Sequence, residues 1–207
     1  MSKTISTENV ENVELTVQKH VVNFCKLLPI HVDKWRKLLE EADKPAQALT
    51  NYAEQLRHVE KANIEYLDKF RDLQEKIRFK VFIEMEEEIS TLKKIIDHLN
   101  QTNQDLKNKL SILERSTIDL CWEANTPLLT GTAFQPPLTR ILQDGLTFFQ
   151  YFANALTKIK DNFKNMDVRD EKNMAKLEKS FKMEYVSKSV TSFLAIVQYV
   201  GNDKAVI

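Results

Sequence analysis

The chain has 207 residues, of which 43% are hydrophobic and 29% are charged, proportions typical of a globular protein. Thirty basic and thirty acidic residues cancel, so no net charge favours nucleic acid or an anionic membrane. Three glycines and five prolines are too few for the chain reversals of a sandwich, a barrel or a doubly wound sheet. We therefore predict an all-α fold, either an elongated helical bundle or a long antiparallel helical hairpin with coiled-coil character.

Residues 1–62 are predicted to form several N-terminal helices. Apolar residues recur at spacings of three and four within 10–28, which is the pattern of one helix face. We expect Pro29 to end this helix, and a second helix to turn Trp35 inward. Pro45 then either begins a further helix or kinks a continuous one, and both alternatives are open at this point.

Residues 63–121 are predicted to form a long coiled-coil-like helix, because glycine and proline are absent from Leu73 to Cys121. A leucine occupies every seventh position, and Asn103 on the opposite stripe would fix the register of paired helices. We assign the coiled-coil seam to Leu92, Leu99, Asn103, Leu106, Leu113 and Leu120. The a positions of the same heptads are Phe82, Ile89, Ile96, Asn103, Leu110 and Thr117.

A DNA-binding leucine zipper is the alternative explanation of this leucine repeat. Such a protein needs a basic helix immediately before the zipper. Here the preceding segment is mixed in charge and ends in Glu84, Glu86, Glu87 and Glu88, which would repel phosphates. Ile95 also widens the apolar stripe, as in a helix inside a globular bundle. We therefore predict no sequence-specific DNA binding.

The remainder of the chain is predicted to return along the long helix. Residues 122–137 contain three of the five prolines and are expected to form a loop. Residues 138–200 are predicted to form C-terminal helices that pack back on the long helix, and 201–207 to be a frayed tail. Gly145 lies on the apolar stripe of the first of these helices, so we expect a close approach of another helix there.

Two features could contact a partner protein. The aromatic residues of 148–152 cover more than one helix face, so this helix either is central to the bundle or meets another subunit. The acidic cluster that follows Lys80 is either a docking patch or a solvated face. We assign the partner interface to Trp35, Phe148, Tyr151, Glu86, Glu87 and Glu88.

The sequence shows no reaction chemistry. No glycine-rich phosphate loop is present, and paired carboxylates occur only in charge runs. The histidines have no metal-binding spacing on one helix face, and we assign all four to surface or capping positions: His20, His31, His58 and His98. We expect a protein that is not an enzyme and that has no cofactor or metal.

The cysteines and the apolar runs bear on location. Cys25 and Cys121 have no metal or redox spacing, so both are interpreted as buried small hydrophobic residues in a reducing compartment. The first residues lack the apolar core of a signal peptide, and the run 193–200 is too short to cross a bilayer. We expect an intracellular protein that has no membrane partner.

The order of short sequence pieces resembles a known family. The most specific pieces are NYAEQL at 51–56, FRDLQEKI at 70–77 and LTRILQDGLTFFQ at 138–150. With these pieces the segment from about residue 27 to 165 resembles the AAA-ATPase-interacting ribosome maturation factor family (AIRIM-like proteins).

This resemblance implies a non-catalytic adaptor subunit of an assembly built around hexameric AAA ATPases. Such an assembly promotes cytoplasmic maturation of pre-60S ribosomal particles by releasing and recycling assembly factors. The implied partners are AAA ATPase subunits and a second small coiled-coil subunit, with the pre-60S particle contacted indirectly. The implied location is the cytoplasm, with the nucleus as a second location. The alternatives are the cyclin-dependent-kinase-interacting partner protein of the same assembly and a structural coiled-coil subunit of a tether or kinetochore-like scaffold.

Overall fold

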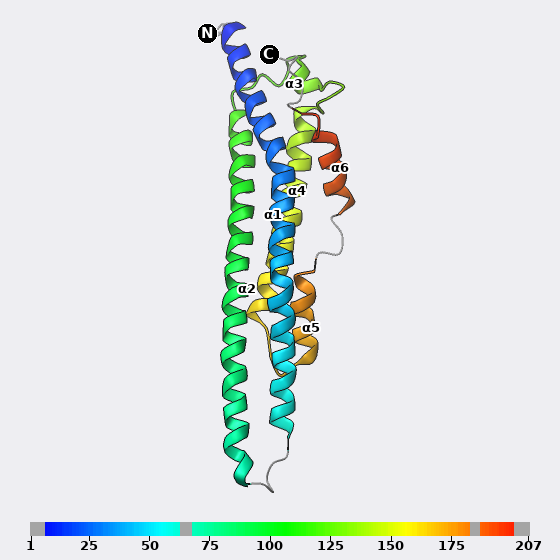
Figure 1. Cartoon of the computed structure of the whole chain (residues 1–207). Helices are drawn as coiled ribbons and strands as arrows, with labels where there is room; N and C mark the ends of the chain where they lie inside the picture. The colour runs from blue at the N-terminus through cyan, green and yellow to red at the C-terminus, as the bar shows by residue number, and fades with distance from the viewer. Residues whose placement is uncertain (1–6, 63–67, 183–186, 201–207) are drawn as a thin grey trace. The chain divides into compact units, whose positions relative to one another are not determined.

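The computed structural model describes residues 7–62, 68–182 and 187–200 (Figure 1). Within these ranges the chain forms six α-helices and no strand, which confirms the predicted all-α fold. The predicted frayed tail, 201–207, lies outside the described residues. In chain order the helices are α1 (Thr7–Lys61), α2 (Asp68–Ser116), α3 (Pro127–Thr130), α4 (Leu138–Lys164), α5 (Glu171–Ser180) and α6 (Lys188–Val197).

The helices are divided between two compact units. Helices α1, α2 and α4 are each divided between the units, with one part in unit 1 and the other part in unit 2. Helices α3 and α6 belong to unit 1, and α5 belongs to unit 2. Each unit has its own buried apolar residues and is a helical bundle. Among the described residues, unit 1 comprises 7–34, 101–153 and 187–200, and unit 2 comprises 35–62, 68–100 and 154–182.

Helix α1 continues through both prolines, so the prediction that Pro29 ends a helix is wrong. Several helices were predicted within residues 1–62, and the structure has one helix there. At Pro45 the helix is continuous and does not begin anew. A proline inside a helix removes a backbone hydrogen bond and costs about 3 kcal/mol. Leu28 before Pro29 and His31 after it are both buried on one stripe. Burial of large apolar side chains at about 1.5–3 kcal/mol each along this stripe offsets the local cost.

The core of unit 1 is formed by α1, α2, α4 and α6. Gly145 of α4 lies so close to α1 that an added Cβ would be 2.9 Å from the Phe24 ring, which confirms the predicted close approach. The Phe24 ring therefore occupies the space that a side chain at position 145 would fill. The buried apolar residues of this unit include Val17, Val21, Phe24, Leu28, Leu106, Leu110, Leu113, Leu138, Ile141, Phe148, Phe152, Val190 and Phe193.

In unit 2, α1 and α2 run antiparallel as a helical hairpin (Figure 1). The Gln74 amide donates a hydrogen bond to the Val59 carbonyl (2.6 Å) beside the connection between the two helices. Helix α4 also packs on α2 here, since Lys160 Nζ donates to Asn100 Oδ1 at 2.7 Å. The buried apolar residues include Leu39, Leu49, Leu56, Val81, Met85, Leu92, Leu99, Leu156, Ile159, Met174 and Leu177.

All six predicted seam residues are buried, but only five belong to α2, because α2 ends at Ser116 and Leu120 lies beyond it, where a helix to residue 121 was predicted. Ile95 is buried as well, which gives α2 a wide apolar stripe. The assignment of Phe82 to a heptad a position is wrong. Its side chain is 41% exposed, and Val81 and Met85 are buried instead. A straight α-helix drifts by about 20° per heptad relative to a 3.5-residue repeat. Counted back from Asn103, the a positions therefore rotate away from the stripe, and Phe82, three heptads away, is turned outward.

Candidate partner interface

The structure separates the residues assigned to a partner interface into buried and accessible ones. Trp35 and Phe148 are each only 1% exposed, so a partner could not reach them while the helices stay packed. Tyr151 is half-buried and packs edge-on against Phe152, with ring centroids 5.1 Å apart. The aromatic residues of α4 thus contribute mainly to the core of unit 1. The interface hypothesis therefore depends on the glutamates and on what lies beside them.

The acidic cluster of α2 has two sides. Glu84 and Glu88 are half-buried, and Glu84 Oε2 accepts a hydrogen bond from Tyr52 Oη of α1 at 3.4 Å. Desolvation and then the carboxylates of Glu84, Glu88 and Glu87 raise the pKa of Tyr52. Glu86 and Glu87 are exposed instead. The cluster therefore has a side that faces α1, with Glu84 and Glu88, and a side that faces solvent, with Glu86 and Glu87.

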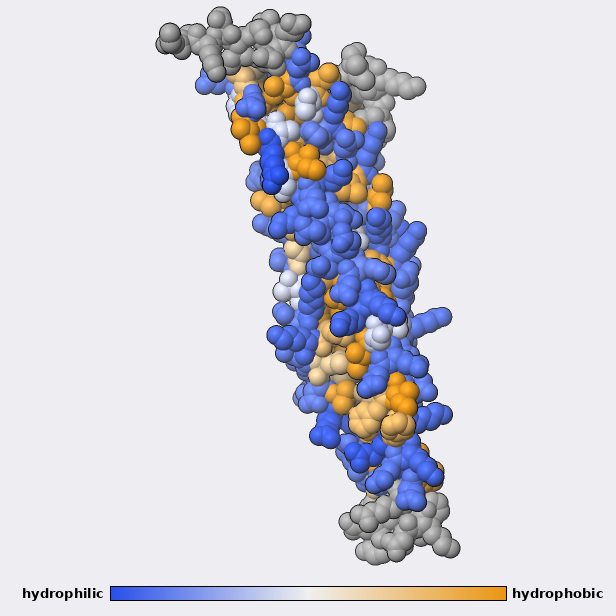
Figure 2. All heavy atoms as spheres, turned by 90° about the vertical axis from the view of Figure 1, so that its left-hand side faces the viewer, coloured by the Kyte–Doolittle hydropathy of each residue, from blue (hydrophilic) through white to orange (hydrophobic). Residues whose placement is uncertain are grey.

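Apolar side chains stand next to the exposed glutamates. Phe79 is 68% exposed, and Phe82 and Ile83 are each just over 40% exposed. Together with Glu86 and Glu87 they form what we call the α2 outer face. Figure 2 looks onto the α2 side and shows apolar side chains gathered near its lower end. A contiguous exposed apolar patch beside charged residues is typical of a surface that contacts another molecule.

The α2 outer face borders a shallow depression in unit 2, lined by Ile83, Glu86, Glu87, Ser90, Thr91 and Lys94. Within the described part of the chain, neither Glu86 nor Glu87 makes an ion pair, and neither does Lys94. Three charged groups thus surround apolar surface without being neutralised by the chain itself. This arrangement offers both apolar contact and charge selection to a partner.

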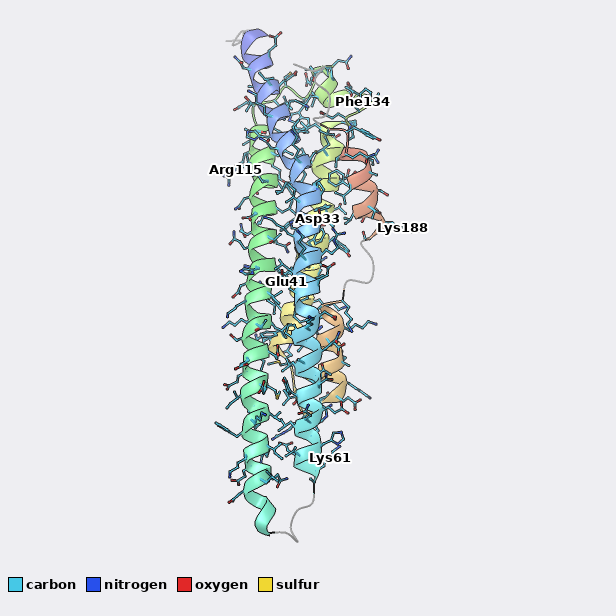
Figure 3. The ribbon with its side chains drawn as sticks, viewed as in Figure 1. Asp33, Glu41, Lys61, Arg115, Phe134 and Lys188 are labelled. Carbon is cyan, nitrogen blue, oxygen red and sulfur yellow. The ribbon has the colours of Figure 1, made fainter. Side chains whose placement is uncertain are left out.

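Sequence reasoning found only the acidic half of this face. In the heptad register Phe82 is an a position, which predicts an inward side chain, and the charge run indicates the acids alone. The signal is nevertheless present, because Phe79, Ile83, Glu86 and Ser90 follow one another at spacings of four, three and four, opposite the seam. Other exposed apolar residues include Leu73 and Ile77, one turn apart on α2, and Phe134 in the connection before α4 (Figure 3).

A buried polar cluster in unit 1 corrects the histidine assignment. His31 is 1% exposed and lies against Phe152 and Phe148, with ring centroids 4.6 and 5.8 Å away. It occupies the α1 stripe, three residues after Leu28, a spacing that could have predicted its burial. Nearby, Asn103 Nδ2 donates to the Phe152 carbonyl at 3.1 Å, so the seam asparagine bonds to α4.

Burial lowers the pKa of His31 to about 4, and Lys34 acts in the same direction. A hydrogen bond with the backbone of Thr102 and the charge of Asp105 oppose the shift. The imidazole is therefore neutral at pH 7. A neutral imidazole is compatible with its position against two phenylalanine rings, whereas an imidazolium would lose its hydration there.

The two cysteines differ in environment. Cys25 is buried as predicted, and burial raises the pKa of its thiol to about 12, so the thiol stays protonated. The prediction that Cys121 is buried is wrong, because α2 ends at Ser116 and Cys121 is exposed in the turn region beyond it. In the described ranges, no three His, Cys, Asp or Glu residues are placed to share a metal ion. None of the helices there is both long and apolar enough to span a bilayer.

Fold and surface together define the class of the molecule: an all-α helical-bundle protein with an exposed apolar and acidic helix face. Residues 15–198 match the family described as CA109-like, ribosome biogenesis protein C1orf109-like. The match covers most of the chain, which therefore belongs to this family of ribosome biogenesis proteins. No curated protein matches the sequence. The resemblance is thus confirmed at the level of ribosome biogenesis.

Proposed function

We propose that the chain is a non-catalytic adaptor subunit of an AAA-ATPase complex. In this proposal the complex promotes cytoplasmic maturation of pre-60S ribosomal particles by releasing and recycling assembly factors. The ATPase supplies the energy, and the chain positions the ATPase on the particle. Its direct partners are AAA ATPase subunits and a second small coiled-coil subunit, with the particle contacted indirectly, in the cytoplasm and also in the nucleus.

The observation that carries the adaptor role is the α2 outer face. An adaptor has to present surface that its own fold leaves uncovered, and Phe79, Phe82 and Ile83 are such a surface beside two unpaired carboxylates. Family membership supports the ribosomal context. The sequence pieces at 51–56, 70–77 and 138–150 support the ATPase connection through the resemblance they carry. The absence of a nucleophile, base or phosphate loop motif in the sequence supports a non-catalytic role.

The second candidate, a structural coiled-coil subunit of a tether or kinetochore-like scaffold, has less support. Such a subunit would pair with another chain through its leucine seam. Here Leu92, Leu99, Leu106 and Leu113 are fully buried within a single chain. The seam therefore needs no second chain to cover it.

Affinity purification of the tagged chain with quantitative mass spectrometry tests the proposal. We expect an AAA ATPase at near-stoichiometric levels, together with a small coiled-coil protein and pre-60S components. A matched control is the same chain with Leu99→Ala and Leu106→Ala, which we expect to lose folding and every specific partner. Recovery of only membrane-tethering or cytoskeletal proteins by the unmodified chain would contradict the proposal.

A further inference from the structure

The charges of the α2 outer face follow a fixed order along the helix. Lys80, Ile83 and Glu87 occupy positions i, i+3 and i+7, so they lie along one side of α2. Lys80 and Glu87 are both exposed, and Ile83 between them is 42% exposed. The row therefore reads basic, apolar, acidic over two helical turns.

A second α2 that runs in the opposite direction presents the order acidic, apolar, basic, which is complementary to the first. In an antiparallel pair of identical helices related by a two-fold axis near Ile83, Lys80 of one copy faces Glu87 of the other, and this pairing occurs twice. Lys80 and Glu87 lie on the same side of α2, and the two-fold axis places that side of both copies on one flank of the contact. Both Lys80–Glu87 pairs therefore form on that flank. Ile83 of the two copies then meets at the centre of the contact, and Phe79 lies at each end of it, one position beyond Lys80.

The lysine and the glutamate are available for such pairing. Neither Lys80 nor Glu87 makes an ion pair with any residue that the structure describes. Arg78 does not compete for Glu87, because its guanidinium lies 3.8 Å from Glu60 of α1. The ion pairs would form beside apolar surface, where they are screened less than fully exposed pairs.

We propose that the α2 outer face is a self-association surface, on which a second copy of this chain docks antiparallel through α2. A second copy fits both ends of the row. A uniformly basic partner helix would attract Glu87 but repel Lys80. A uniformly acidic partner helix would attract Lys80 but repel Glu87. Polyanions such as RNA would be repelled by Glu86 and Glu87.

The contact is small, so the dimer is weak. A single helix face buries less than the about 800 Å² per partner of a standard interface. Association is therefore in the micromolar range and is sensitive to salt, since the two ion pairs set the register of the contact. Self-association goes beyond the proposed adaptor role, and it can be tested on the purified chain without any ATPase.

Sedimentation of the full-length chain from about 1 µM to a few hundred micromolar tests this directly. We expect a monomer–dimer equilibrium. Lys80→Glu and Glu87→Lys, each alone, place like charges opposite each other twice and weaken the dimer by about tenfold or more. The double variant Lys80→Glu/Glu87→Lys restores both ion pairs and returns the dissociation constant to within about threefold of the unmodified value. Lys107→Glu, an exposed lysine elsewhere on α2, is the matched control and should leave it unchanged.

Mixing provides an independent readout. The Lys80→Glu chain carries two acids in the row and the Glu87→Lys chain carries two lysines, so a one-to-one mixture should form a heterodimer that neither forms as a homodimer. Circular dichroism melts verify that each variant is folded. A chain that stays monomeric throughout the concentration range would overturn the proposal. So would a dimer that is indifferent to both single substitutions, or one that the double substitution fails to rescue.

Discussion

The two units differ in where the rule of apolar inside and polar outside is broken. Unit 1 buries polar side chains, with His31 and Asn103 both at most 6% exposed. Both units expose large apolar side chains, but in unit 2 Phe79, at 68%, and Ile83, at 42%, lie one turn apart on one helix beside unpaired glutamates. Buried polar groups must be hydrogen-bonded and so specify one packing arrangement. Exposed apolar groups contribute little to the fold and are free to contact other molecules. Unit 1 therefore carries a feature of fold specification, and unit 2 carries one of recognition.

The largest expected effect compares one residue type in the two environments. Phe148→Ala removes a ring that is 1% exposed and packs against Phe152 and Phe193, so we expect a loss of about 3–5 kcal/mol in the free energy of unfolding. Urea denaturation followed by circular dichroism measures this loss. If the substitution cost less than about 1 kcal/mol, Phe148 would not belong to a well-packed core.

The next effect is the pH dependence that comes from His31. Its folded pKa of about 4 is below the unfolded value of about 6.5, so the unfolded chain binds more protons between these values. The stability contributed by the neutral imidazole is present above pH 6.5 and is lost as pH falls toward 4, by up to about 3 kcal/mol.

His31→Leu is the control for that measurement, because it keeps an apolar side chain in the cluster and removes the titration. Urea midpoints of both proteins at intervals between pH 7 and pH 4 isolate the contribution of His31 from that of the carboxylates. Parallel pH profiles would show that His31 is not buried in its neutral form.

A smaller effect is expected from Gly145→Ala. Alanine is the better helix former by about 1 kcal/mol, so propensity alone predicts stabilisation. The added methyl group would lie 2.9 Å from the Phe24 ring, however, and overpacking of a close contact costs about 1–3 kcal/mol. We expect a net destabilisation of about 1 kcal/mol, visible as a lower urea midpoint. A raised midpoint would mean that α1 and α4 are farther apart in unit 1 than described.

The smallest expected effect completes the comparison. Phe79→Ala should change the free energy of unfolding by no more than about 0.5 kcal/mol, because the ring is mostly in solvent. The same urea titration used for Phe148→Ala measures it. A large destabilisation would place Phe79 in a core and remove it from the recognition surface of unit 2.

The scarcity of glycine and proline was sufficient to predict the all-α fold, and the heptad repeat to predict the burial of the leucines from Leu92 to Leu120. Sequence reasoning failed where local rules compete with packing. The break was expected at Pro29 because a proline costs a helix a backbone hydrogen bond. Helix α1 continues because its buried stripe of side chains extends on both sides of Pro29. Phe82 was misplaced because a heptad template ignores the drift of a straight helix.

The candidate site was predicted only in part, for a different reason. The charge run identified Glu86 and Glu87, since a cluster of acids is visible in one sequence. Whether Phe79 and Ile83 are covered by another helix cannot be deduced from α2 alone, because it depends on where α1 and α4 lie. His31 was missed because its residue type suggested a surface position, although its spacing from Leu28 indicated the stripe.

The most direct test of the proposed adaptor role in ribosome biogenesis follows the particles themselves. Cytoplasmic pre-60S particles would be isolated after depletion of the protein and after re-expression of the intact chain, and the assembly factors retained on them quantified by mass spectrometry. We predict that depletion increases the retained factors and that re-expression returns them to their normal level. Particles of unchanged composition after complete depletion would contradict the account.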